Sequence, residues 1–123
     1  MPLVDFVFPQ TDENAKPYTG MAQIIRIPDI GKTVSAAKNA EVAILLHNPE
    51  GNAYNFVFEI VLSETGEAIY RSGLVMPGMC IENPVLSKAL EEGEYSAVIR
   101  IIYETDGSFL PGGVDVAITL LFE

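Results

Sequence analysis

Apolar and polar residues alternate with a period of two along three stretches of the chain, at residues 54–63, 95–103 and 114–122. Successive side chains of a β-strand point to opposite faces, so this period predicts strands that bury one face. The residues expected to point into the core are Phe56, Phe58, Ile60, Leu62, Ala97, Ile99, Ile101, Tyr103, Val114, Val116, Ile118, Leu120 and Phe122.

Shorter apolar runs separated by turn residues predict four more strands. These are at residues 22–27, 42–46, 68–72 and 79–86. Gly66 suits the positive-φ position of a hairpin turn, and Pro77 followed by Gly78 suits a type II turn. Pro84 has no backbone N–H, so it interrupts its strand or moves it to a sheet edge.

The stretch at residues 33–46 has two interpretations. Val34, Ala37, Glu41 and Ile44 are roughly helix-spaced, which is compatible with a helix. The β-branched residues and the turn sequence NPEGN that follows favour a strand at 42–46 instead.

Residues 86–95 cross between the two predicted sheets and end in Gly93, Glu94 and Tyr95. A Tyr that begins a strand after such a crossing is typical of the tyrosine corner of immunoglobulin-like domains, in which its hydroxyl bonds the backbone of the crossing. We therefore predict an all-β, immunoglobulin-like antiparallel β-sandwich of about seven strands, to which an N-terminal strand can be added.

The first 20 residues differ from the rest. The apolar run LVDFVF at residues 3–8 ends at Pro9, and the polar segment QTDENAKPYTG is typical of a linker. We divide the chain into an extension at 1–20 and one sandwich domain at 21–123, a usual domain size. The apolar run is either an unordered tail or an extra strand laid against the sandwich.

The charge balance argues against two classes of partner. The chain has 17 acidic and 7 basic residues, which gives a net charge of −10. Nucleic acids and anionic membrane surfaces are bound by clustered Lys and Arg, so neither is expected here. The simplest role of the negative charge is to keep a β-rich protein soluble.

Residues suited to catalysis are sparse. His47 is the only histidine and Cys80 the only cysteine, so no intrachain disulfide can form and no His/Cys metal spacing exists. A nucleophilic pair requires these two residues to meet in space, and nothing in the sequence demands it. The acidic segments 12–14 and 104–108 are typical of solvated turns. We therefore expect no enzyme, no cofactor and no metal site.

The outward side of the three long strands is unusual. The outside of a solvated antiparallel sheet should alternate to polar residues, yet only Glu59, Arg100 and Thr119 interrupt the apolar series. A contiguous apolar patch usually marks an interface. The candidate interface residues are Val57, Val61, Val98, Arg100, Ile102 and Leu121.

Three explanations of this face remain open. Residues 3–8 or a loop cover it within the chain, or a second copy or another protein covers it. A one-residue slip in the predicted register would instead exchange the inward and outward faces.

Three segments carry a resemblance to a known group of proteins: LHNPEGNAYNFVFEI, IYRSGLVMPGMCIENPVLSKALEEGEYSAVIRI and VDVAITLLFE. They resemble small uncharacterised membrane-anchored proteins of Gram-positive, clostridial-type gut bacteria, over residues 21–123. The shared motifs are Asn48-Pro49, Leu74-x-x-Pro77-Gly78 and Leu90-x-x-Gly93-x-Tyr95. The resemblance implies an N-terminal anchor, a Pro- and acid-rich linker and one extracellular immunoglobulin-like domain. No anchor is visible in this sequence, and the resemblance assigns no catalytic or ligand residue.

Together these features predict a non-enzymatic protein-binding or accessory module of the bacterial cell surface. It would recognise a protein partner, or a second copy, through an apolar sheet face or an edge strand. The alternative is a structural or assembly subunit of a surface fibre or phage, in which residues 3–8 add a strand to a neighbour. We expect an extracellular, surface-anchored location, with a cytoplasmic one as the alternative, and membrane attachment only through an anchor outside this chain.

Overall fold

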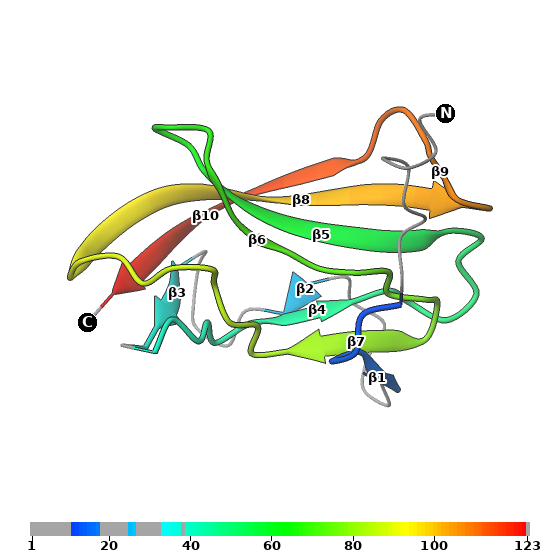
Figure 1. Cartoon of the computed structure of the whole chain (residues 1–123), viewed down its shortest axis with the longest axis horizontal. Coiled ribbons are helices and arrows are strands. Elements are labelled where there is room, and N and C mark those ends of the chain that lie inside the picture. The colour runs from blue at the N-terminus through cyan, green and yellow to red at the C-terminus, as the bar shows by residue number, and fades with distance from the viewer. Residues whose placement is uncertain (1–10, 18–24, 27–32, 38, 123) are drawn as a thin grey trace, which may run out of the picture.

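The computed structural model describes residues 11–17, 25–26, 33–37 and 39–122. Within these residues the chain forms strands and no helix, arranged as two sheets that face each other across a core (Figure 1). The predicted immunoglobulin-like β-sandwich is thereby confirmed, with several short strands in addition to the expected ones.

The larger sheet holds the three long alternating strands side by side, in the order β3-β10-β8-β5-β6. β3 runs parallel to β10, and the other neighbours are antiparallel. Their bounds are β3 (Thr33–Ala36), β5 (Asn55–Leu62), β6 (Ala68–Arg71), β8 (Gly93–Thr105) and β10 (Val114–Phe122). A further strand, β9 (Ser108–Phe109), pairs with the end of β8.

The smaller sheet has the order β1-β7-β4-β2 and is antiparallel throughout. Its strands are β1 (Lys16–Pro17), β2 (Ile25–Arg26), β4 (Leu45–His47) and β7 (Met79–Glu82). In Figure 1 this sheet lies below the larger one.

Residues 11–17, which the sequence assigned to a polar linker, are part of the sandwich. Lys16 pairs with Cys80 at the edge of the smaller sheet. The Asp12 carboxylate accepts a hydrogen bond of 2.8 Å from the Gly73 amide, and the Asp12 amide donates to the Leu74 carbonyl at 2.8 Å. The apolar run at residues 3–8 lies outside the described residues.

Two predictions about individual elements differ from the structure. The helical interpretation of 33–46 is wrong, because Thr33–Ala36 pairs with β10 and Val42 forms a bridge to Ala36. β7 ends at Glu82 rather than at residue 86. Asn83 adopts a positive φ of 54° and Pro84 lacks an amide, so the ladder cannot continue, as expected of that proline.

The core has the predicted register. All the residues expected to point inward belong to the buried cluster or pack against it, except Val114, which is 38% exposed because β10 begins there at the end of the sandwich. Phe56 and Phe58 meet edge to face with ring centroids 5.8 Å apart. The register of the long strands therefore follows directly from their alternation.

Tyr95 forms the predicted tyrosine corner. Its hydroxyl donates a hydrogen bond of 2.8 Å to the Glu91 carbonyl in the crossing between the sheets. Its ring packs edge to face on Phe122 at 5.6 Å. The crossing is thus tied to the strand that it leads into, as in other immunoglobulin-like domains.

Candidate functional site

The outer sheet face, meaning the side of β5, β8 and β10 that points away from the core, carries all six predicted interface residues. Val57 lies opposite Ile102 and Val61 lies opposite Val98 on neighbouring strands. The inward neighbours of these residues form the core, which rules out a slip of register.

Exposure across the outer sheet face is graded. Val57 is only 1% exposed and Val61 only 9%, so the expectation that β5 presents them to a partner is not met. Val98, Ile102 and Leu121 on β8 and β10 are partly exposed. The accessible portion of the face therefore lies over β8 and β10.

A row of alternating charges crosses the middle of this face. Arg71, Glu59, Arg100 and Asp115 are successive register partners on β6, β5, β8 and β10. Arg71 pairs with Glu59, Arg100 Nη1 lies 3.9 Å from Glu59 Oε1, and Arg100 Nε lies 3.5 Å from Asp115 Oδ1. The charges of Glu59 and Arg100, which interrupt the apolar series in the sequence, are thus compensated by each other and by Arg71 and Asp115.

One contact spans the face above β5 and β8. β6 lies beyond β5, whereas β9 pairs with the opposite edge of β8. The Arg71 guanidinium nevertheless lies 5.8 Å from the centroid of the Phe109 ring on β9. This contact therefore passes over the outer side of the two strands.

Three connections meet at one end of the sandwich, which we call the loop end. They are residues 48–54 between β4 and β5, 72–78 between β6 and β7, and 106–113 between β8 and β10. In Figure 1 they lie at the right, where β8 ends and β7 begins.

Asn48 ties the first two of these connections together. Its side chain is fully buried, and its Nδ2 donates to the carbonyls of Tyr54 and Val75, both at 2.9 Å. Its Oδ1 accepts a hydrogen bond of 2.7 Å from Asn52, and its carbonyl accepts one of 2.6 Å from the Gly78 amide. A buried amide satisfied on every side holds the loops in one arrangement.

Glu104 organises the third connection, and here the expectation of a solvated turn is wrong. Its side chain is 2% exposed and accepts hydrogen bonds from Asn55 Nδ2 at 2.8 Å and from the Gly107 amide at 2.5 Å. Asp106 and Gly107 have positive φ angles, as a two-residue hairpin turn requires. Of the acidic residues in this turn, Asp106 is the one that faces solvent.

The structure also brings His47 and Cys80 together, which the sequence did not foresee. They are direct register partners on β4 and β7. His47 is 3% exposed and Cys80 is 1% exposed, so neither side chain is accessible to a substrate from outside. The two side chains are therefore buried in the sandwich and are not placed to act on a substrate as nucleophile and base.

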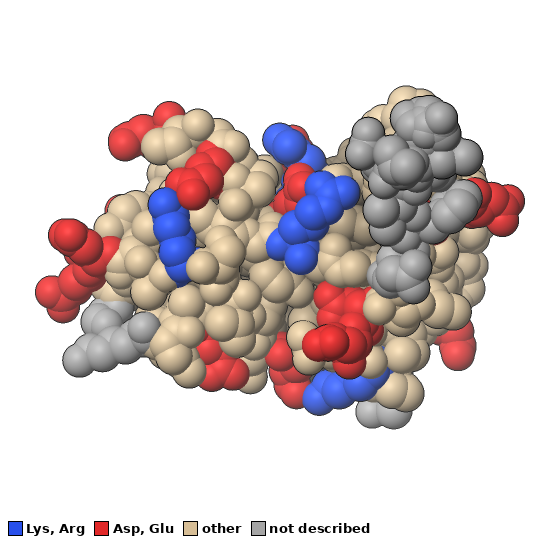
Figure 2. Space-filling view, in the orientation of Figure 1, with Lys and Arg blue, Asp and Glu red and all other residues tan. Residues whose placement is uncertain are grey.

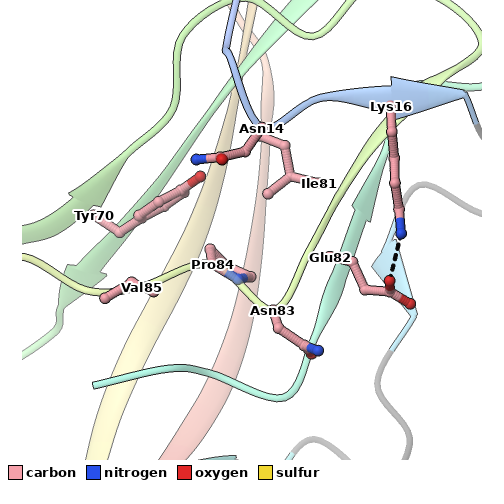
Figure 3. A pocket seen from close by; sticks show the side chains of 8 residues that line it. All are labelled: Asn14, Lys16, Tyr70, Ile81, Glu82, Asn83, Pro84 and Val85. Atoms are coloured by element: carbon pink, nitrogen blue, oxygen red, sulfur yellow. Dashed lines mark hydrogen bonds and ion pairs between the residues drawn. The ribbon is translucent and has the colours of Figure 1, made fainter. Parts of the chain in front are cut away.

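A cleft of about 290 Å³ opens where the edges of the two sheets meet, beside β6, β1 and β7 (Figure 3). Burial, aided by the negative charge of Asp12, raises the pKa of the Tyr70 hydroxyl, which therefore stays protonated. Figure 3 shows this hydroxyl and the Asn14 side chain pointing toward one another, and the 2.6 Å ion pair of Lys16 and Glu82 at one side. The cleft lies at the lower limit of small-ligand sites.

The described part of the chain holds no group of three or more His, Cys, Asp or Glu side chains that could bind a metal ion. A search of the same residues found no helix able to cross a membrane. In Figure 2 the outermost charged side chains at both ends of the molecule are Asp and Glu.

No family model matched this chain, and no match was found among curated proteins or among solved structures. The resemblance to surface proteins of gut bacteria therefore stays a prediction. The candidate binding surfaces are therefore argued only from the geometry, burial and charge described above.

Proposed function

We propose that this chain is a non-enzymatic protein-binding or accessory module of the bacterial cell surface that recognises a partner through the outer sheet face. The observation that carries the proposal is that Val98 and Ile102 are partly exposed on either side of the exposed Arg100, with Leu121 partly exposed farther along the same face, opposite Glu94. The surface location rests on the resemblance of the turn and core motifs.

The physical argument concerns specificity. Apolar side chains on a rigid sheet give contact area at little cost in conformational entropy, while fixed charges disfavour wrong partners. The row from Arg71 to Asp115 fixes such charges between two apolar rows, Val57 with Ile102 and Val61 with Val98. A partner would contact Ile102 and Val98, the partly exposed members of these rows, and place polar groups against the charged row.

The test replaces Val98 by Lys. A charge on this row should reduce capture of surface proteins from a bacterial cell-wall extract by at least about tenfold, because an apolar contact is lost and a charge is buried. Ser96→Lys is the matched control, since Ser96 is an exposed polar residue of the same strand and face. Equal capture by wild type and Val98→Lys, measured by quantitative mass spectrometry, would contradict the proposal.

The second candidate is a structural or assembly subunit of a surface fibre or phage. It is favoured by the short apolar run LVDFVF at residues 3–8, whose length and apolar character suit strand addition to a neighbouring copy. Light scattering across a dilution series should then show oligomers in the full chain and monomers after deletion of residues 1–10. A full chain that stays monomeric at every concentration excludes this candidate.

A further inference from the structure

We infer that the loop end binds a basic segment of a partner protein that also carries apolar or aromatic side chains. This inference rests on the proposed protein-binding function and names the chemistry of the partner. The surface involved, which we call the loop-end patch, consists of Tyr54, Met76, Phe109, Glu50 and Asp106.

Exposed large apolar side chains are concentrated at this end. Among the described residues, the large hydrophobic side chains with high exposure are Tyr54 (42%), Met76 (46%), Val85 (57%), Phe109 (48%) and Val114 (38%). All except Val85 lie in or next to the three connections of the loop end. Such clustering usually marks an interaction site, whereas single exposed apolar residues need no explanation.

Strand register gives the patch its dimensions. Val75 bridges Phe56, so Met76 lies beside Asn55, which pairs with Glu104. Glu104 in turn pairs with Phe109. Met76 and Phe109 are therefore separated by three strand spacings, about 14 Å. This span suits a segment of protein rather than a small molecule.

The charge of the patch has one sign. Glu50 lies against the turn that follows Met76, because a Cβ atom on Gly78 would be 3.8 Å from Glu50 Cβ. Asp106 occupies the turn before Phe109 and faces solvent. Residues 48–54, 72–78 and 106–113 contain no Lys or Arg. Each acidic side chain thus accompanies an exposed apolar one, which is complementary to a partner carrying Lys or Arg next to apolar residues.

The molecule already shows one such contact internally. The Arg71 guanidinium lies 5.8 Å from the centroid of the Phe109 ring, yet Phe109 remains 48% exposed. Arg71 is also paired with Glu59, so its charge is compensated within the outer sheet face. The exposed part of the Phe109 ring can take a second cation from a partner in the same way.

The loops that carry the patch are organised in advance. Asn48 joins residues 48–54 to the 72–78 connection, and Glu104 joins β5 to the turn at Gly107. Binding therefore needs little ordering of loops, which lowers its entropic cost.

The inference is tested by phage display: random peptides of about 12 residues are selected for binding to the immobilised full chain. We expect the enriched peptides to combine Lys or Arg with aromatic or aliphatic residues. A synthetic peptide from the selection should then bind about tenfold more weakly to Tyr54→Ser, Met76→Ser and Phe109→Ser. Val85→Ser, which removes a more exposed apolar side chain outside the loop end, should bind like wild type.

Charge variants test the second half of the inference. Glu50→Gln and Asp106→Asn should each weaken binding severalfold at low salt and by less at high salt, because the attraction is screened. Glu92→Gln is the control, since Glu92 is an exposed acidic residue in the crossing at 86–95, away from the loop end. An equal effect of all three variants would mean attraction to the net charge alone, and would overturn the inference.

The outcomes separate this inference from the proposed function. Enriched peptides without basic residues whose binding is lost in Val98→Lys and kept in Phe109→Ser would overturn the inference and leave the outer sheet face as the binding surface. A selection that enriches no peptide above an empty-support control would count against both.

Discussion

At the residue scale, a few polar side chains determine how the connections are held. Tyr95 satisfies a carbonyl of the crossing, Asn48 satisfies a carbonyl of the 72–78 connection, and Glu104 satisfies the Gly107 amide in the turn that follows it. Burying a polar group without a partner costs about 1–3 kcal/mol, so these residues contribute mainly by what their loss would leave unpaired.

The tyrosine corner gives the first residue-scale prediction. Tyr95→Phe keeps the ring on Phe122 and removes the hydrogen bond to the Glu91 carbonyl. We expect the free energy of unfolding to fall by about 1 kcal/mol. Urea titration measures it, with Tyr54→Phe as the control because the Tyr54 side chain is exposed. Equal midpoints for wild type and Tyr95→Phe would show that the hydrogen bond is not stabilising.

Tyr70 gives a prediction about alkaline pH. Burial raises the pKa of its hydroxyl above the usual value near 10, so folding favours the neutral phenol. The resulting stabilisation is complete below the unfolded pKa and is lost as pH rises through the folded pKa. Wild type should therefore lose stability relative to Tyr70→Phe above about pH 10, by at most ~1 kcal/mol per pH unit given its partial exposure.

Urea unfolding of both proteins between about pH 8 and about pH 11 measures this difference. The value at the lowest pH gives the baseline cost of removing the hydroxyl. A constant difference across the range would mean that the hydroxyl titrates alike in the folded and unfolded chains.

At the scale of elements, the charged row connects four strands of the larger sheet. Glu59 is its centre, with a side chain only 11% exposed between Arg71 and Arg100, which are about half exposed. Glu59→Gln should destabilise the fold by about 1 kcal/mol, because both guanidinium groups lose a counter-charge while keeping contact with solvent.

Asp115→Asn is the matched comparison for the charged row. Its side chain is 60% exposed and 3.5 Å from Arg100, so its removal should cost less than about 0.5 kcal/mol. Thermal unfolding in low and high salt checks both values, and the Glu59 effect should persist better in salt. If Glu59→Gln and Asp115→Asn lower the free energy of unfolding by the same amount, Glu59 does not contribute more to stability than the other members of the charged row.

Element boundaries show how far the sequence can predict this fold. Local alternation sets the faces of β5, β8 and β10, and Gly66, Pro77 and Gly78 mark the turns. The two-residue strands β1 and β9 have no periodicity to detect. The burial of Glu104 and the pairing of His47 with Cys80 depend on partners remote in sequence, so composition alone suggested a solvated turn and two unrelated residues.

The loop end could have been predicted from the sequence. Alternate connections of an antiparallel chain fall at the same end, so the segments after β4, β6 and β8 share one end. The exposure of Met76 and Phe109 could not be predicted, because each is an apolar residue in a short segment without a clear face.

At the scale of the whole molecule, the two candidate surfaces form one continuous region. Met76 and Phe109 lie at the margin of the same outer sheet face that carries Val98 and Ile102. A partner could therefore extend from the loop end along β8. The cleft beside Tyr70 and the smaller sheet lie elsewhere on the sandwich.

Hydrogen–deuterium exchange of the full chain, with and without a selected peptide, tests the account most directly. We predict slower exchange on binding at residues 96–105 of β8 and in the connections 48–54, 72–78 and 106–113. The smaller sheet should be unchanged. Protection confined to β7, β4 and the Tyr70 cleft would contradict the assignment of the binding surface.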